Sequence, residues 1–394
     1  MRQAVLDLEE SMIRQVANAG MGRSDVLKFW FGESDEVTPQ FVRDAAALSM
    51  QNGETFYAHN LGLPELREAI AGYSNGLRAQ GATKIGADRI AVTTGGVNAL
   101  MLTVQALVNS GDEVVVVTPV WPNLTAQPAI MGGLVQSVSL KPVAGQWQLD
   151  MAELLAAVTN KTKLLILNAP NNPTGWTLLR AEQEIILAHC RKTGTWILAD
   201  EVYERLYYEP TDNGCAPSFL DISAPDDRLV VVNSFSKSFL MTGWRLGWLV
   251  VPEALAPVIE RIAQNLFICA STVAQHAALA CFEPESLAEY EGRRAEFKVR
   301  RDYFIPELNR LGLSVPVMPD GAFYAYADCT AAAARLGVSG SWDFAFELMK
   351  RAHLAVTPGR DFGHAAPEQF VRFSTANSMA QLKEAVVRLE TVLG

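Results

Sequence analysis

The sequence predicts an α/β fold, with a mostly parallel sheet of seven strands between helices in a large domain and a smaller α+β domain beside it. Apolar runs with the length of buried strands alternate with helical patterns along much of the chain. The chain has 394 residues, of which 49% are hydrophobic, so it can form a substantial core and more than one domain. The strand-like runs lie near residues 89–94, 113–118, 134–140, 163–168, 195–200, 229–233 and 245–251.

The first of these strands leads into a helix through a pair of glycines. Gly95 and Gly96 follow residues 89–94, and Leu100 and Val104 then recur at helical spacing. Free N–H groups and the positive dipole end at the start of a helix favour an anion, and glycines let a phosphate approach the backbone closely. This turn is therefore a candidate phosphate site, and a plain strand–helix turn is the alternative.

Two later strands carry polar side chains at their ends. Residues 163–168 run into a loop rich in turn formers, in which Asn172 offers a side-chain amide. Residues 195–200 end on Asp200, and Tyr203 follows. A carboxylate at the C-terminal end of a strand lies where α/β sheets bind ligands. The structural alternatives are a simple tight turn around Asn172 and helix N-capping by Asp200.

Lys237 lies between two serines, shortly after the apolar run 229–233, and Arg245 follows it. A buried lysine amine can form a Schiff base with an aldehyde, and serine and arginine side chains are suited to a phosphate. An aldehyde and a phosphate on one molecule indicate pyridoxal 5'-phosphate (PLP), an electron sink that stabilises carbanions. The connection to residues 245–251 is too short for a helical crossover, so one of the two strands should be antiparallel or at an edge.

The C-terminal part of the chain predicts a second, smaller domain. Residues 289–308 are charged on one face and carry Phe297, Phe304 and Leu308 on the other, as expected of a long interdomain helix. Further expected elements are a helical pattern from 253 to 310, strands and turns at 312–327, a helix at 341–353, a strand at 371–374 and a closing helix at 379–393. We therefore expect a large PLP-binding domain at residues 40–275 and a small domain formed by residues 1–39 and 276–394.

Five segments occur in the order and at the approximate spacing of one known family. They are Asn172-Pro173-Thr174-Gly175, Asp200-Glu201-Val202-Tyr203, Ser234-Phe235-Ser236-Lys237, Gly243-Trp244-Arg245 and Arg372-Phe373-Ser374. With these segments the chain resembles the aspartate aminotransferase family of fold-type I PLP enzymes, the class I/II aminotransferases, from about Leu8 to its end. The resemblance implies a homodimeric, PLP-dependent aminotransferase that moves an amino group between an L-amino acid and a 2-oxo acid.

The resemblance also implies a role for each matching residue. Lys237 resembles the Schiff-base lysine that shuttles the proton, and Asp200 resembles the partner of the pyridine nitrogen. The residues that resemble those around the ring are Asn172 and Tyr203, which bond its O3′ oxygen, and Trp121, which stacks on it. The residues that resemble phosphate binders are Gly96, Val97, Ser234, Arg245 and Tyr57, the last reaching the phosphate of the neighbouring subunit. Arg372 resembles the arginine that pairs with the substrate α-carboxylate, and Gly32 falls in the loop that closes over it.

Three positions bear on the substrate side chain. Some members that use acidic substrates have a lysine where this chain has Val97, and some relatives have a threonine where it has Ile13. An apolar pocket rejects a charge strongly, so we expect an amino donor with a neutral, apolar or aromatic side chain. Arg360 is the candidate partner for the distal carboxylate of an acceptor such as 2-oxoglutarate, and charge pairing with Asp361 on the surface is its alternative.

Composition excludes other classes of protein. The net charge of −10 argues against nucleic-acid binding. The five cysteines are scattered without metal or CxxC spacing, as is typical of a reduced, cytoplasmic protein, and the five histidines also lack ligand spacing. The sequence shows neither a signal peptide nor an apolar run of about 18 residues, so we expect neither export nor a membrane span. We therefore expect small-molecule partners and no metal.

Other functions are compatible with the same cofactor. A C–S lyase or a decarboxylase could use this fold, because fold and cofactor do not fix the reaction. A PLP-sensing regulator would need a DNA-binding module, and no basic helix-turn-helix extension precedes residue 40.

Overall fold

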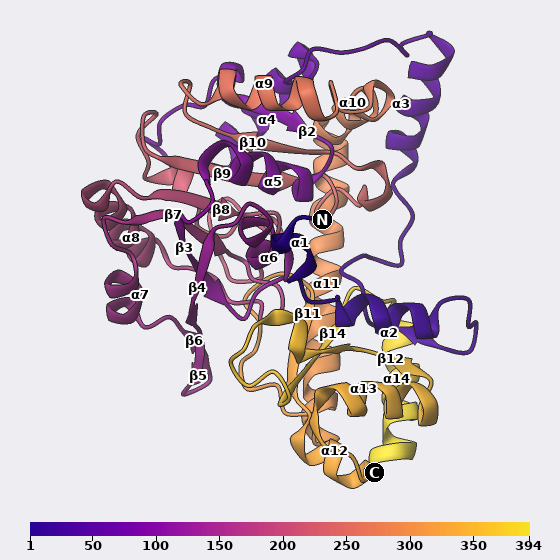
Figure 1. Ribbon diagram of the computed structural model, residues 1–394. Helices are drawn as coiled ribbons and strands as arrows, with labels where there is room; N and C mark the ends of the chain where they lie inside the picture. Colours follow the sequence, from indigo (N-terminus) through magenta and orange to yellow (C-terminus); the bar gives the residue numbers. More distant parts are fainter.

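The computed structural model describes residues 1–394 and contains all seven predicted strands in one sheet (Figure 1). The strand order is β2-β10-β9-β8-β7-β3-β4. The bounds are Ile90–Thr93 (β2), Glu113–Thr118 (β3), Leu134–Ser139 (β4), Thr162–Asn168 (β7), Trp196–Asp200 (β8), Leu229–Ser234 (β9) and Gly247–Val250 (β10). Only β10 is antiparallel to its neighbours, and it lies between β2 and β9. The predicted antiparallel strand is thus confirmed, whereas its alternative place at an edge is wrong.

Helices cover both faces of this sheet because its strand residues alternate between two apolar cores. One core joins side chains such as Val116 and Leu198 to α5, α6 and α9. The other joins their neighbours Val115 and Ile197 to helices that include α4, α8 and α10. The bounds are Gln40–Gln51 (α3), Pro64–Gly76 (α4), Gly96–Leu107 (α5), Asn123–Ile130 (α6), Met151–Ala157 (α7), Arg180–Thr193 (α8), Ala256–Leu266 (α9) and Thr272–Leu279 (α10). Two apolar faces are typical of a parallel sheet enclosed by helices.

A second group of elements packs around its own apolar core. It contains the sheet β11-β14-β13 and the parallel pair β1-β12. The bounds are Met12–Gly20 (α2), Leu27–Lys28 (β1), Tyr324–Asp328 (β11), Thr330–Leu336 (α12), Gly340–Arg351 (α13), Leu354–Ala355 (β12), Thr357–Pro358 (β13), Phe370–Ser374 (β14) and Met379–Leu393 (α14). The short helix Gln3–Leu6 (α1) contacts α6 instead. The helices and the short strand expected in this region are confirmed, but the domain boundaries at 40 and 275 stay a prediction.

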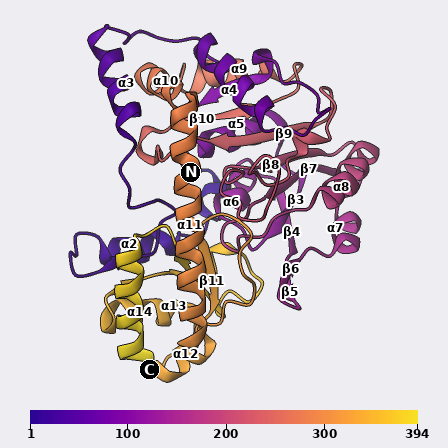
Figure 2. The same cartoon turned by 180° about the vertical axis from the view of Figure 1, so that it is seen from behind.

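The helix α11, Pro284–Arg310, runs along the molecule from α10 to α12 (Figures 1 and 2). Its side chains Phe297, Phe304 and Leu308 are buried, as the apolar face of the predicted long helix requires. No helix of the structure combines the length and the apolar character that crossing a membrane would need. A small hairpin, Lys141–Val143 (β5) with Gln146–Gln148 (β6), completes the strands.

Candidate active site

A cavity of about 950 Å³ lies between the seven-stranded sheet and the second group of elements. The large sheet contributes Asp200 and Ser234 to its wall, and the three-stranded sheet contributes Tyr324 and Arg372. Every site residue predicted from the sequence lines it except Tyr57. These residues are Gly32, Gly96, Val97, Trp121, Asn172, Asp200, Tyr203, Ser234, Lys237, Arg245, Arg360 and Arg372.

The topology explains why residues so distant in sequence meet. Asn168, Asp200 and Ser234 are the last residues of β7, β8 and β9, and Asn168 lies opposite Asp200 in the strand register. These three strands are parallel, so their carboxyl ends reach the same edge of the sheet. Gly96, the first residue of α5, lines the cavity as well.

The turn before α5 forms a tight concave surface against Arg245. Gly95 has a φ of +91°, and a Cβ atom on it would lie 2.6 Å from Arg245 Nη2. A Cβ atom on Gly96 would lie 3.4 Å from the Ser234 Cβ atom. Arg245 itself takes a left-handed backbone conformation with a φ of 55°. Free backbone N–H groups, a serine hydroxyl and a guanidinium therefore surround one small space, which suits a phosphate.

Lys237 lies on the connection between the paired strands β9 and β10, and its Nζ atom donates a hydrogen bond to the Gly32 carbonyl. Burial lowers the pKa of Lys237 to about 8, and the nearby positive charge of Arg372 adds to this effect. At neutral pH about a tenth of such an amine is uncharged, and the uncharged form is the nucleophile. Lys237 is half-buried in the cavity wall, and its role as an activated lysine stays a prediction.

Asp200 is buried at the end of β8. Its Oδ1 atom accepts a hydrogen bond from the backbone N–H of Val202 at 3.3 Å, and its other carboxylate oxygen has no donor in the protein. Burial raises the pKa of Asp200 to about 7. No helix begins at this point of the chain, so the alternative of helix N-capping is wrong. A buried carboxylate with a free oxygen is suited to a cationic nitrogen of a ligand.

Arg372 is 2% exposed and is held by backbone and side-chain oxygens. Its Nη1 atom donates to Asn172 Oδ1 at 2.7 Å, and its Nη2 atom donates to the Trp30 carbonyl and to Thr357 Oγ1. Its guanidinium carbon lies 4.5 Å from the centroid of the Tyr324 ring. The Nε atom is buried without any acceptor in the protein. A buried N–H donor without an acceptor costs free energy, and a carboxylate that enters the cavity could supply the acceptor. Arg372 is therefore suited to binding a carboxylate.

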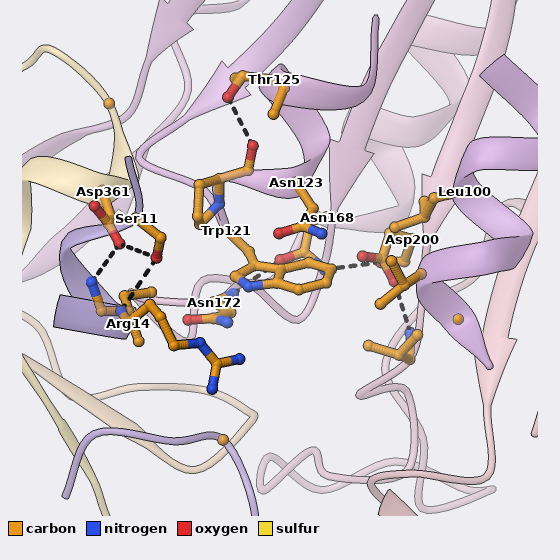
Figure 3. Close-up of a pocket in the computed structure, with 18 of the residues that line it drawn as sticks. Ser11, Arg14, Leu100, Trp121, Asn123, Thr125, Asn168, Asn172, Asp200 and Asp361 are labelled. Atoms are coloured by element: carbon orange, nitrogen blue, oxygen red, sulfur yellow. Dashed lines mark hydrogen bonds between the residues drawn. The ribbon is translucent and has the colours of Figure 1, made fainter. Parts of the chain in front are cut away.

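Aromatic and amide groups fill the space between these charges. The hydroxyls of Tyr203 and Tyr324 form a hydrogen bond of 2.7 Å. The Asn172 amide accepts from Arg372 through its oxygen, which leaves its Nδ2 atom without a protein acceptor. Figure 3 shows the Trp121 ring in the middle of the cavity, between Asn172 and Asp200. This arrangement places the Asn172 amide and the tyrosine hydroxyls in the same cavity as the face of an aromatic ring.

Arg360 lines the cavity, but its guanidinium forms an ion pair with Glu368 and lies 5.8 Å from the ring centroid of Trp342. The alternative partner Asp361 is wrong. Its carboxylate instead accepts from the backbone N–H groups of Met12 and Ile13, at 2.8 and 2.7 Å. No pattern in the sequence gives Asp361 a role at the site, and its contact across the fold reveals one.

Gly32 and Tyr57, two further predicted residues, differ from each other in where they lie. Gly32 lies in the cavity wall, where a Cβ atom would lie 1.9 Å from the Tyr324 hydroxyl, so only glycine fits there. Tyr57 lies outside the cavity on an exposed segment, with 81% of its surface accessible. The structure of one chain therefore does not bring Tyr57 to the site.

Other residues of the site were not predicted from the sequence. Asn168 donates to the backbone carbonyl of Asp200 and accepts from the backbone N–H of Asn172, which ties the ends of β7 and β8 together. Its place as the last residue of a predicted strand was a usable signal. Tyr324 also lines the cavity, and no local pattern in the sequence indicates its bond to Tyr203. Arg14 of α2 also lines the cavity.

Comparisons with known proteins show which family the chain belongs to. The family described as "Aminotransferase class I and II" matches residues 24–389. The chain belongs to this family. A relative from Aquifex aeolicus, named probable aspartate/prephenate aminotransferase, is 36% identical over 371 residues, which cover 94% of this chain and 91% of the relative.

Solved structures show the same relation for the fold of this aminotransferase. A single mutant of the Thermus thermophilus aspartate aminotransferase matches with a TM-score of 0.90 and 30% identity, covering 100% of this chain and 99% of that one. The aromatic aminotransferase from Pyrococcus horikoshii OT3 matches with a TM-score of 0.85 and 32% identity, covering 97% and 98%. The fold-type I architecture predicted from the sequence is therefore confirmed.

The comparisons also decide between the predicted activities. The relatives named here are described as aminotransferases, and none as a lyase, a decarboxylase or a regulator. The protein is thus an enzyme that transfers an amino group between an amino acid and a 2-oxo acid. Members of its family generally depend on PLP.

Proposed function

We propose that this aminotransferase uses PLP bound in the cavity described above, with Lys237 as its covalent attachment point. The observation that carries this proposal is the convergence of Lys237, Asp200 and Arg372 on one cavity. When bound, PLP supplies an electron sink for the carbanion at the substrate α-carbon. Gly96, Ser234 and the Arg245 guanidinium would hold its phosphate, because they surround the anion-sized space before α5.

The protein side chains divide the remaining tasks. Asp200 would keep a proton on the ring nitrogen, since an anion beside the ring stabilises the cationic form. The free Nδ2 atom of Asn172 and the Tyr203 hydroxyl would donate to the ring oxygen, with Trp121 stacked on the ring. The Lys237 Nζ atom, in the fraction that is uncharged at neutral pH, would take the proton from the substrate α-carbon and return it to the product.

Arg372 would bind the substrate α-carboxylate. Its buried Nε atom lacks an acceptor, and the planar fork of a guanidinium matches a carboxylate in two parallel hydrogen bonds. Replacing Arg372 by Lys should weaken every amino acid and 2-oxo acid, because a point charge cannot reproduce the fork. Val97 and Ile13 add apolar surface to the cavity, which favours an amino donor with a neutral side chain.

We further propose a cytoplasmic homodimer. Tyr57 and Phe56 are 81% and 82% exposed, and Leu266 and Ile268 are also exposed. The Asn60 side chain donates to the Ile268 carbonyl, so the two apolar segments form one surface. Large exposed apolar side chains grouped in this way are suited to a symmetric contact with a second copy. A fully active monomer in light scattering under assay conditions would contradict this assembly.

The cofactor proposal can be tested without measuring turnover. Purified protein is loaded with PLP, reduced with borohydride and mapped by peptide mass spectrometry. The adduct is expected on Lys237 and is expected to disappear in the Lys237→Ala variant. Lys161→Ala, which removes an exposed lysine outside the cavity, serves as the control. An adduct on another lysine would disprove the assignment. A panel of amino acids assayed with 2-oxoglutarate and pyruvate would then identify the donor.

A further inference from the structure

Arg14 differs from the other strongly basic side chains that line the cavity. Lys237 and Arg245 donate to backbone carbonyls, Arg372 has several oxygen partners, and Arg360 pairs with Glu368. The guanidinium of Arg14 forms no hydrogen bond or ion pair with any residue of the chain. Its contact is with the face of Phe31, whose ring centroid lies 5.4 Å from the guanidinium carbon.

The helix that carries Arg14 is fixed firmly to the cavity wall. The Asp361 carboxylate accepts from the N–H groups of Met12 and Ile13 and from the Ser11 hydroxyl at 3.0 Å. The Ser11 Oγ atom in turn accepts from the Arg14 N–H at 3.3 Å. The first turn of α2 therefore has its free N–H groups satisfied, and its position is set by a residue of the wall.

This anchoring determines where the Arg14 side chain lies. Ile13 and Val16 are buried on the inner face of α2, which fixes the rotation of the helix about its axis. Figure 3 shows the Arg14 side chain extending from α2 along the cavity, with its guanidinium below Asn172 in this view. Phe31 supports it from one side. A cation so placed, with its donors unused, is available to a ligand.

The acidic side chains of the cavity wall disfavour a second carboxylate unless a cation lies beside it. Asp7, Glu9, Glu10 and Glu33 also line the cavity, so an entering dicarboxylate meets several negative charges. Arg372 is used by the α-carboxylate under the proposed function. The charge of Arg360 is already paired with Glu368 through its Nε atom, whereas Arg14 has no ion pair.

We propose that Arg14 is the residue that recognises the distal carboxylate of a dicarboxylic substrate, such as 2-oxoglutarate, in place of Arg360. This inference rests on the proposed function, in which Arg372 binds the α-carboxylate. It makes the first turn of α2 a specificity-determining element. A guanidinium can bind the distal group through two donors, which gives geometric selectivity as well as charge.

The test compares two acceptors in the PLP-loaded enzyme with one fixed amino donor. The ratio of kcat/KM for 2-oxoglutarate to kcat/KM for pyruvate is measured in the wild type, Arg14→Gln and Arg360→Gln. A charge-assisted hydrogen bond lost on one substrate only should lower this ratio about 10- to 100-fold in Arg14→Gln. Arg14→Lys should recover part of the loss. Arg23→Gln, which removes an arginine outside the cavity, controls for net charge.

A binding measurement gives a second readout. The dissociation constant of maleate, a dicarboxylate without an amino or oxo group, is measured by calorimetry for the same variants. Arg14→Gln should weaken maleate by a similar factor, with Arg360→Gln close to the wild type. An unchanged ratio in Arg14→Gln, a loss confined to Arg360→Gln, or an equal loss on both acceptors would overturn the inference. Absence of transamination in the wild type would instead refute the proposed function itself.

Discussion

Replacing Asp200 by Asn should stabilise the cofactor-free protein at neutral pH. Burial raises the pKa of this carboxyl group from its usual 3.8 to about 7. The folded protein therefore binds the proton more tightly than the unfolded chain, and its free energy of unfolding falls as the pH rises from 3.8 to 7. About three pKa units at 1.36 kcal/mol each correspond to about 4 kcal/mol. Water in the cavity solvates the carboxylate, so this figure is an upper bound.

The assay is denaturant unfolding of the cofactor-free wild type and Asp200→Asn at pH 5, 6, 7 and 8. The variant should gain stability relative to the wild type as the pH rises, with the full difference reached above pH 7. Lys237, whose pKa is lowered to about 8, changes its contribution only above this range. Asp226→Asn, at an exposed carboxylate, is the control. Equal pH slopes in wild type and Asp200→Asn would refute the reasoning. The same variant should lose transamination by orders of magnitude, because an amide carries no negative charge to keep the ring nitrogen protonated. Stability and function therefore conflict at this position.

Three further substitutions have expected outcomes. Gly95→Ala should weaken PLP at least tenfold in a spectroscopic titration, because its Cβ atom would lie 2.6 Å from Arg245 Nη2. Arg78→Met should lower the free energy of unfolding by about 3–5 kcal/mol, since it leaves the carboxylate of Glu204, now 3.0 Å from Arg78, buried without its cation. Tyr324→Phe should cost about 1–3 kcal/mol in the same unfolding assay, because a buried hydroxyl loses its partner at 2.7 Å.

Much of the fold could be predicted because its signals are local. Each of the seven strands is a short apolar run, and strand–helix alternation indicates a parallel sheet without any knowledge of contacts. The antiparallel direction of β10 followed from the length of one connection. Its place inside the sheet did not, because strand order depends on pairing between distant segments. The hairpin β5–β6 was not predicted either, since its strands are short and mostly exposed.

The site also combines features that local sequence predicts with features that it does not. Lys237, Asp200 and Arg372 stand in recognisable local segments, so their convergence was predictable. Their partners were not, because each contact joins residues far apart in the chain. The bond from Arg372 to Asn172 spans 200 positions, and the bond from the Ile13 N–H to Asp361 spans 348. Such pairings are set by tertiary packing and leave no periodic signal in the sequence.

The segment that carries Lys237 begins and ends on neighbouring strands. Ser234 lies opposite Gly247 in the register of β9 and β10, and the Phe235 N–H donates to the Leu246 carbonyl at 3.1 Å. Residues 235–246 thus form a loop whose two ends are held about 5 Å apart by the pairing of the strands. In engineering this enzyme, the length of the loop 235–246 should be kept. One residue added or removed would shift Lys237 relative to Arg245. The exposed tip of the β5–β6 hairpin, by contrast, is a place where an inserted tag should be tolerated.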